Sequence, residues 1–260
     1  MNLRVLGCSG SDLPGQHLTA FLVESNILLD AGSVTSTLDL AEQARIEHIF
    51  VTHPHLDHIK DILFLADNLI EFFAASARPP LQIHGLPEVL DAIAIHLLND
   101  TIWPDFTVIP ANSPVLTYAP MQPGVPVTIG DITVTTWPVN HAQAASGYVL
   151  WREGGAQNLA YTGDTGVCDD WWRFCDSLPF ALSHLITEAS FPSDMEELAA
   201  VSKHLTPRLL RAELAKLRAK PEILIYHMKA PFAGQIQQEL ACELAGHSYR
   251  LLREKESFDL

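Results

Sequence analysis

Positive charge is scarce in this 260-residue chain. Lys and Arg together number 16 against 31 Asp and Glu, so the formal net charge is −15 at pH 7. Proteins that bind nucleic-acid polymers contact the phosphate backbone through clustered Lys and Arg side chains. We therefore expect no nucleic-acid polymer as a partner. A small anion remains compatible with this composition, because bound divalent metal ions can reverse the charge locally.

Long apolar runs and paired cysteines are also lacking. The longest apolar candidates, 62–69 and 89–98, are interrupted by Asp67 and Asp91 and fall short of the roughly 18 residues that cross a membrane, so we expect no membrane partner. Residues 1–7 indicate a short strand, not a signal peptide. The cysteines show neither C-x-x-C pairs nor disulfide-framework spacing (Cys8, Cys168, Cys175 and Cys242). We predict a cytoplasmic protein with reduced thiols.

Apolar side chains are abundant. Hydrophobic residues make up 48% of the chain, which is enough to bury a sizeable core. Strand-like and helix-like runs alternate along the sequence. Among them we predict a helix over 61–75, a helix over 208–218 capped by Thr206, and a final edge strand within 249–258.

One short segment concentrates polar chemistry. Thr52-His53-Pro54-His55-Leu56-Asp57-His58 holds three imidazoles and a carboxylate directly after an apolar run that indicates a buried strand. His53 and His55 are two apart in an extended segment, so their side chains leave the same face. Asp57 and His58 lie where the chain turns into a helix and aim at a second point. Imidazole with carboxylate suits zinc, iron or manganese, whereas a solvated polar loop fits this spacing poorly.

The second half of the chain repeats this arrangement. His141, Asp164 and His227 each come just after a run that indicates a strand, and Gly163 would let the backbone approach its neighbours closely. Loops at strand ends are held in place by the rigid sheet. Each residue alone is a weak signal, but after the first segment they indicate one shared metal site.

The pattern His53-x-His55-x-Asp57-His58 resembles the ligand signature of the metallo-β-lactamase fold. The longer string Thr-His-Pro-His-Leu-Asp-His-Ile is similar to the class II cyclic-nucleotide phosphodiesterases within that fold. The resemblance runs from the Gly-Cys-Ser-Gly turn at residue 7 to His227. It implies one domain over 1–260 with an α+β fold, an αββα sandwich of two pseudo-symmetric halves. Where the family often has Gly, this chain has Asp61, which we expect in the first turn of the following helix.

The resemblance also implies a ligand set for two divalent metal ions, zinc in the first place with manganese or iron as alternatives. The ligands of one ion would be three imidazoles: His53, His55 and His141. The ligands of the other would be Asp57, His58 and His227. Asp164 would bridge the two ions. A hydroxide between them would attack phosphorus, oriented by Asp57.

Further site residues follow from the same resemblance. Glu188 and His204 match a pair in the tRNA 3′-processing ribonucleases, where His-Glu-Ala-Thr stands in place of Thr187-Glu188-Ala189-Ser190. His204, backed by Glu188, would donate a proton to the leaving oxygen. A purely structural ion pair is the alternative. Asp30 is expected to brace the metal loop through hydrogen bonds without binding metal.

The loop 99–106 resembles a segment that lies near the substrate in class II phosphodiesterases. We therefore predict that Asn99 and Trp103 bind substrate, with Trp103 stacked on a nucleobase. The alternative is that Trp103 pins a long loop to the core.

The function that these residues favour is hydrolysis of a 3′,5′-cyclic nucleotide, cAMP or cGMP, to the 5′-monophosphate. A tRNA 3′-processing ribonuclease is the nearest rival, but it should need a basic docking arm that this acidic chain lacks. Other hydrolases of the fold would act on a 2′,3′-cyclic phosphodiester, a lactone or a thioester. A diiron redox protein would usually have Glu in place of His55, and intact ligand types disfavour a non-catalytic sensor. A homodimer is a family expectation.

Overall fold

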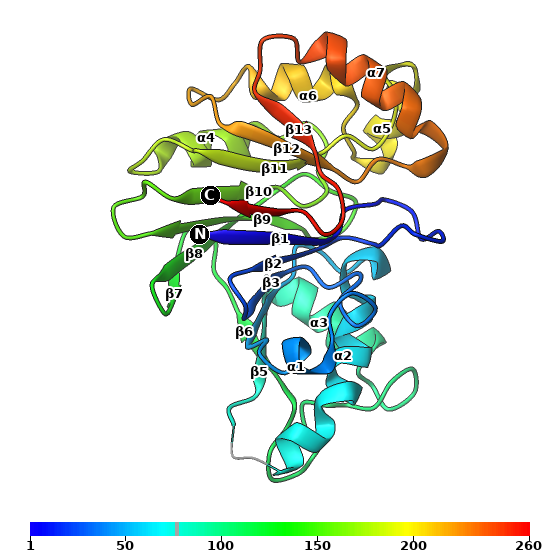
Figure 1. Ribbon diagram of the computed structural model, residues 1–260, viewed down its shortest axis with the longest axis vertical. Coiled ribbons are helices and arrows are strands. Elements are labelled where there is room, and N and C mark those ends of the chain that lie inside the picture. Colours follow the sequence, from blue (N-terminus) through cyan, green and yellow to red (C-terminus); the bar gives the residue numbers. More distant parts are fainter. Residues whose placement is uncertain (76–77) are drawn as a thin grey trace.

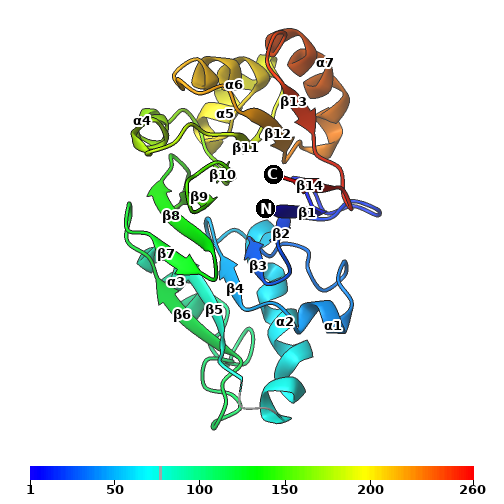
Figure 2. The ribbon, with the colours of Figure 1, turned by 60° about the vertical axis from the view of Figure 1, so that its left-hand side comes forward.

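The computed structural model describes residues 1–75 and 78–260. In these residues two seven-stranded sheets lie face to face, and helices cover the outer face of each sheet (Figure 1, Figure 2). The structure is therefore the αββα sandwich of the α+β class that the sequence predicts.

The two sheets repeat one pattern of strand directions. In spatial order the first sheet holds β14 (Ser257–Asp259), β1 (Asn2–Gly7), β2 (Ala20–Val23), β3 (Ile27–Leu29), β4 (His48–Phe50), β5 (Leu81–Gly85) and β6 (Leu116–Pro120). The second holds β7 (Val127–Ile129), β8 (Ile132–Pro138), β9 (Ser146–Arg152), β10 (Asn158–Tyr161), β11 (His184–Glu188), β12 (Glu222–Tyr226) and β13 (Tyr249–Leu251). In each order the first four strands pair antiparallel and the rest join in parallel. This is the pseudo-symmetry of the two halves.

The predicted edge strand within 249–258 is wrong in one respect: the segment forms two strands on different sheets. β13 pairs with β12, and β14 pairs with β1. Between them the chain turns at Lys255, which has a positive φ of 68° and whose N–H donates to Val5 O over 2.9 Å. The C-terminal residues thus join both sheets. On that ground we propose that residues 1–260 form one domain.

The helices cover the sandwich from both sides (Figure 2). The first sheet carries α1 (Leu40–Gln43), α2 (Leu56–Ala75) and α3 (Pro87–His96). The second carries α4 (Asp169–Ser177), α5 (Glu196–Ser202), α6 (Pro207–Leu214) and α7 (Ala233–Glu243), with short 3₁₀ turns at Ser193–Met195 and Ala230–Phe232. Thr206 caps α6 as predicted, although this helix ends at Leu214. Within the described residues, every helix is too short or too polar to cross a membrane.

The position of Asp61 differs from the prediction. Because α2 already begins at Leu56, Asp61 lies in its second turn, where the helix terminus has little influence. Its buried carboxylate instead accepts hydrogen bonds from Val34 N at 2.6 Å, Thr35 N at 2.8 Å and Thr35 Oγ1 at 3.0 Å. Asp61 therefore ties the loop after β3 to α2.

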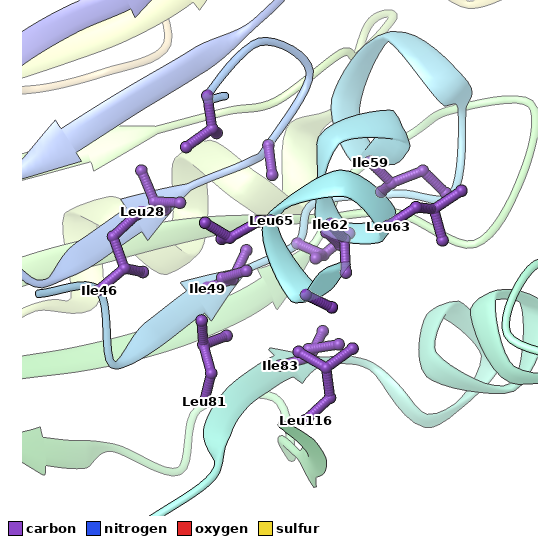
Figure 3. Packing of buried hydrophobic residues seen from close by; sticks show 14 of the residues in the cluster. Leu28, Ile46, Ile49, Ile59, Ile62, Leu63, Leu65, Leu81, Ile83 and Leu116 are labelled. Carbon is purple, nitrogen blue, oxygen red and sulfur yellow. The ribbon is translucent and has the colours of Figure 1, made fainter. Parts of the chain in front are cut away.

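Alternation along the strands divides the apolar side chains into three layers. On β4, Ile49 faces the helices of the first sheet, whereas Phe50 faces the second sheet. Figure 3 shows the outer layer, in which Ile49 and Ile83 lie opposite Ile62 and Leu65 of α2. Since successive strand side chains point to opposite faces, strands buried on both sides are continuously apolar. This is why the strands could be predicted as unbroken hydrophobic runs.

Candidate metal centre

The structure brings the predicted polar residues together at one end of the sandwich. The loops after four strands supply them: β4, β8, β10 and β12. Ligand atoms of three groups lie within 4.8 Å of one another in each case: His53, His55 and His141; Asp57, His58 and His227; His53, His58 and Asp164. Two further groups of this kind include His204: His141, Asp164 and His204, and Glu188, His204 and His227. The predicted ligand set is compatible with the first three groups, and its division between two ions stays a prediction.

Three imidazoles form one side of the cluster. His55 Nδ1 lies 3.0 Å from His53 Nε2 and 3.2 Å from His141 Nε2. Burial lowers the pKa of each of these three histidines. They are therefore neutral near pH 7, the form in which imidazole binds metal.

Two carboxylates lie on the other side. Asp164 Oδ2 lies 3.3 Å from His227 Nε2, 3.4 Å from His58 Nε2 and 3.8 Å from His53 Nε2, so it reaches both groups. Asp57 Oδ2 lies 3.3 Å from His227 Nε2. Burial would raise the pKa of both carboxyls, but the neighbouring imidazoles outweigh it. For Asp164 these are chiefly His227 and His58, and for Asp57 they are the hydrogen bond to His227 and the charge of His58, so both pKa values lie below the ordinary range.

Four of the five imidazoles have one ring nitrogen anchored by the protein. These anchors are His53 Nδ1 to Thr52 Oγ1 at 3.0 Å, His58 Nδ1 to Asp30 Oδ2 at 2.7 Å, His141 Nδ1 to Lys203 O at 3.1 Å, and His227 Nδ1 to Ser190 Oγ at 3.0 Å. A carboxylate or carbonyl oxygen can only accept, so Nδ1 of His58 and His141 carries the proton. Such anchors fix the ring orientation and, in the neutral form of the ring, leave Nε2 free to bind a metal ion.

The donor set fits divalent metal ions. Nε2 of His53, His58 and His227 all face Asp164 Oδ2. Burial would lower the pKa of His58, but the charges of Asp164 and Asp30 raise it well above its ordinary value, so the site stabilises positive charge between these groups. His58 Nε2 is buried and has no hydrogen-bond partner among the described residues. Buried polar atoms in native proteins nearly always have partners, and this one, 3.4 Å from Asp164 Oδ2, is available to a bound cation. Nitrogen and oxygen donors of this kind are those of zinc, manganese and iron sites.

Asp30 braces the loop as expected. It is fully buried and accepts four hydrogen bonds: Thr52 N at 2.8 Å, Thr52 Oγ1 at 2.8 Å, His58 Nδ1 at 2.7 Å and Tyr161 OH at 2.6 Å. Because Thr52 Oγ1 donates to Asp30, it must accept from His53 Nδ1. One carboxylate therefore orients an imidazole of each metal group.

Gly163 permits the close approach that the sequence predicts. It has a φ of +62°, and a Cβ on it would lie 2.8 Å from Thr52 Cβ. A side chain at this position would push the Asp164 loop away from the β4 loop.

Glu188 and His204 lie beside the cluster. His204 Nδ1 donates to Glu188 Oε1 over 2.8 Å and lies 3.9 Å from Asp164 Oδ2. Glu188, fully buried at the end of β11, also accepts from Thr165 N at 2.9 Å and from Ser190 Oγ. Burial would lower the pKa of His204, but the charge and hydrogen bond of Glu188 raise it to about 9. His204 is 8% exposed, so this anchored ring still reaches the surface.

Asn99 and Trp103 do not join the cluster. Trp103 packs against the core and its Nε1 donates to Leu63 O of α2 over 3.2 Å, two turns beyond the metal loop. The Asn99 side chain donates to Ile95 O of α3 and accepts from the N–H groups of Thr101 and Ile102 in its own loop. These contacts are those of the loop-pinning alternative, and substrate binding by the pair stays a prediction.

Sequence reasoning missed three residues around the cluster. Tyr226 OH donates to Asp164 Oδ1 over 3.1 Å, Ser190 joins His227 to Glu188, and Lys203 contacts His141. Each is a direct neighbour in sequence of a predicted residue or stands two positions from one. Their position beside predicted residues was the available sequence signal. Their contacts could not be predicted, because the partner residues lie on loops far away in the sequence.

Four layers with metal-type side chains on strand-end loops define a metallo-β-lactamase-fold protein. Residues 25–228 match the sequence profile described as the Beta-lactamase superfamily domain, so the chain belongs to that family. Within the family it resembles cyclic-nucleotide phosphodiesterases. A 3′,5′-cyclic-nucleotide phosphodiesterase of Aliivibrio fischeri is 28% identical over 256 residues, covering 82% of this chain and 74% of that protein. Two further relatives of that name are matched over only 51% and 57% of their length.

Solved structures agree on the fold. Unliganded yeast PDE1 superposes with a TM-score of 0.83 at 18% identity, covering 100% of this chain and 99% of that one. The short form of human tRNase Z gives 0.71 at 17% identity, covering 100% and 99%. At these identities the likeness is one of fold.

Proposed function

We propose that the protein hydrolyses 3′,5′-cyclic nucleotides, cAMP or cGMP, to 5′-monophosphates with two divalent metal ions, preferably zinc, with manganese or iron as alternatives. The observation that carries the proposal is the placement of the Glu188–His204 pair against the metal cluster, with His204 Nδ1 3.9 Å from Asp164 Oδ2. A metal cluster and a proton donor together suit cleavage of a phosphodiester with a poor leaving group. The relative in Aliivibrio fischeri supports the substrate class.

The chain offers ligands for both ions. One would be held by His53, His55 and His141, the other by Asp57, His58 and His227, with Asp164 shared. When bound, such ions supply a water of lowered pKa and positive charge for the phosphoryl oxygens.

The remaining steps belong to the side chains. Asp57 would accept a hydrogen bond from the attacking water and aim its oxygen at phosphorus. As the new P–O bond forms, the bond from phosphorus to O3′ breaks, and His204 gives a proton to the departing oxygen. Glu188 accepts the hydrogen bond from His204 Nδ1 and stabilises the ring while it carries charge. Ser190 and Thr165 hold Glu188 itself in place.

A tRNA 3′-processing activity is the second candidate. The match to human tRNase Z and the retained Glu188–His204 pair favour it. The net charge of −15 opposes it, because tRNA binding needs a positively charged surface. Activity on a 2′,3′-cyclic phosphodiester, a lactone or a thioester, and a non-catalytic sensor role, are the other outcomes that an assay can return.

The free cysteines bear on the compartment in which the protein works. The four cysteines are all free, which agrees with the reducing interior of a cell. The cytoplasmic location and the homodimer stay predictions, and light scattering on the purified protein would measure the oligomeric state.

The proposal is tested by product analysis of metal-replete protein. Separate reactions would contain 3′,5′-cAMP, 3′,5′-cGMP, 2′,3′-cAMP, bis(p-nitrophenyl) phosphate and a precursor tRNA. We expect rapid formation of a 5′-monophosphate from a 3′,5′-cyclic nucleotide, abolished in Asp57→Ala and reduced about 10²- to 10⁴-fold in His204→Ala and Glu188→Gln. Wild-type activity in Glu188→Gln would make that pair structural. Cleavage of the tRNA alone, or of no substrate despite two bound metal ions, would contradict the proposal.

A further inference from the structure

We propose that Lys203 is a positioning residue that holds the metal-ligand histidine His141 and the proton donor His204 as one unit. Its catalytic consequence rests on the proposed function. Its consequence for metal binding does not depend on the substrate, and the two can be measured separately.

Lys203 and His141 bind each other twice. His141 Nδ1 donates to Lys203 O over 3.1 Å, and Lys203 Nζ donates to His141 O over 2.9 Å. The first bond fixes the tautomer of His141, so that Nε2 faces His55 at 3.2 Å. The second holds the backbone of the same residue. The β8 loop is thereby clamped to the end of α5, 62 residues further along the chain.

The backbone of Lys203 has a conformation that is unfavourable for residues other than Gly. Lys203 ends α5 with φ 55° and ψ 55°, in the left-handed region. Helix ends of this kind usually have Gly, which adopts the conformation without steric cost. The helix end needs only the Lys203 N–H, which donates to Ala199 O and Ala200 O. The helix end therefore does not need the ammonium group, which instead donates to His141 O.

The two hydrogen bonds between Lys203 and His141 also close a ring of contacts around the Glu188–His204 pair. Lys203 is joined to His204 by the peptide bond, and His204 Nδ1 donates to Glu188 over 2.8 Å. Glu188 accepts from Thr165 N at 2.9 Å, and Thr165 Oγ1 accepts from Asn140 N at 3.3 Å. Asn140 precedes His141, whose Nδ1 donates to Lys203 O and so closes the ring. Gly166 lies against Lys203 inside this ring, with its N–H bonded to Asn140 O at 2.8 Å. A shift of His141 is therefore passed to His204 through hydrogen bonds on both sides.

Three substitutions separate the roles of charge and backbone. Lys203→Met removes the ammonium and keeps the apolar stem. Lys203→Arg keeps a donor, and Lys203→Gly relieves the left-handed strain while removing the donor. The matched control is Lys255→Met, because Lys255 is exposed, has a positive φ of 68° and lies in the turn between β13 and β14.

The first readout is Co²⁺ titration followed by visible absorption. In Lys203→Met we expect affinity at one of the two ions to fall about 10- to 100-fold, as is usual when a residue that orients a metal ligand is lost. The second ion should keep its affinity. Lys203→Arg should restore part of the loss, whereas Lys203→Gly should not. Thermal unfolding of metal-free Lys203→Met should match that of metal-free Lys255→Met.

The second readout is steady-state kinetics at saturating metal. We expect kcat of Lys203→Met to fall about tenfold or more with little change in KM, because the donor is displaced while substrate contacts remain. Equal cobalt affinity and equal kcat in Lys203→Met and Lys255→Met would overturn the proposal, and so would full activity in Lys203→Gly. If the wild-type protein hydrolyses no cyclic nucleotide, the proposed function fails but the cobalt titration still decides the role of Lys203.

Discussion

Asp30 shows how much of the centre depends on a residue outside the predicted ligand set. Its carboxylate accepts four hydrogen bonds, one from His58 and two from Thr52, which in turn anchors His53. An amide in this place would turn an N–H₂ group toward at least one buried donor.

We therefore predict that Asp30→Asn lowers the free energy of unfolding by about 3 kcal/mol, since unsatisfied buried polar groups cost about 1–3 kcal/mol each. Metal affinity should fall about 10- to 100-fold. Urea unfolding of the metal-free protein and metal titration would measure the two effects. Asp131→Asn is the control, because Asp131 is an exposed carboxylate paired with Arg152. Similar behaviour of the two variants would contradict the bracing role.

A pair of histidines away from the metal ligands predicts a pH dependence of stability. His84 is buried, stacks on Phe50 and lies with its Nε2 3.0 Å from His48 Nδ1. Burial, and then His48, lower the pKa of His84 from 6.5 to about 4. Between these values the unfolded chain binds more protons than the folded one, so stability is complete above pH 6.5 and is lost as the pH falls toward 4.

The contribution of His84 to this loss is about 3 kcal/mol, from 1.36 kcal/mol per unit of pKa. His84→Gln keeps a hydrogen-bonding side chain but cannot ionise, so its stability should fall less steeply between pH 6.5 and 4. Urea unfolding of both metal-free proteins at several pH values measures the difference, in which the titration of histidines that do not contact His84 largely cancels. Parallel pH profiles would refute the assignment.

Individual site residues could be predicted where the signal is local. His53, His55, Asp57 and His58 share one loop, so their spacing alone indicates a joint site. The contact between His48 and His84 could not be predicted, because it depends on the alignment of β4 with β5.

At the scale of elements, runs of apolar residues predict the buried strands well, since both faces of each sheet are covered. The errors fall where neighbours far away in sequence decide the structure. The segment 249–258 divides between two sheets because β1, at the other end of the chain, offers a free edge to β14, so that Asn2 pairs with Asp259. α2 begins at Leu56, within the metal segment, and so Asp61 faces the loop after β3.

The loop after β10 provides a prediction at this scale. In Gly163→Ala the new Cβ would lie 2.8 Å from Thr52 Cβ, and the positive φ of 62° adds strain. The loop must move, and it carries Asp164 with it. We expect activity and metal affinity to fall at least tenfold, and stability to fall by about 1–3 kcal/mol.

Gly154→Ala is the matched control, because Gly154 has a φ of +81° but no atom within 4 Å of the position of a Cβ. This variant should show the backbone strain and keep its metal content. Equal metal affinity in the two variants would mean that the contact between Gly163 and Thr52 does not position Asp164.

At the scale of the whole molecule, the αββα architecture and the family follow from one ligand signature and the order of strands. The substrate does not follow in the same way. The loop 99–106 resembles a segment near a substrate, yet Trp103 is bound to Leu63 of α2 and Asn99 to Ile95 of α3. A local resemblance cannot show whether a side chain turns toward the site or toward the core.

Bound cations would reconcile the strongly acidic composition with the proposed anionic substrate. A net charge of −15 would repel an anionic substrate, whereas two divalent ions would make the end of the sandwich locally positive. The number of bound metal ions is therefore the quantity on which the proposed function depends most.

The most direct measurement is the metal content of the purified protein by inductively coupled plasma mass spectrometry after equilibration with zinc and dialysis. We predict about two ions per chain, and about one in both His141→Ala and His227→Ala, because each substitution removes a proposed ligand of a different ion. Fewer than two ions in the wild-type protein, or an unchanged content in both variants, would contradict the dinuclear centre.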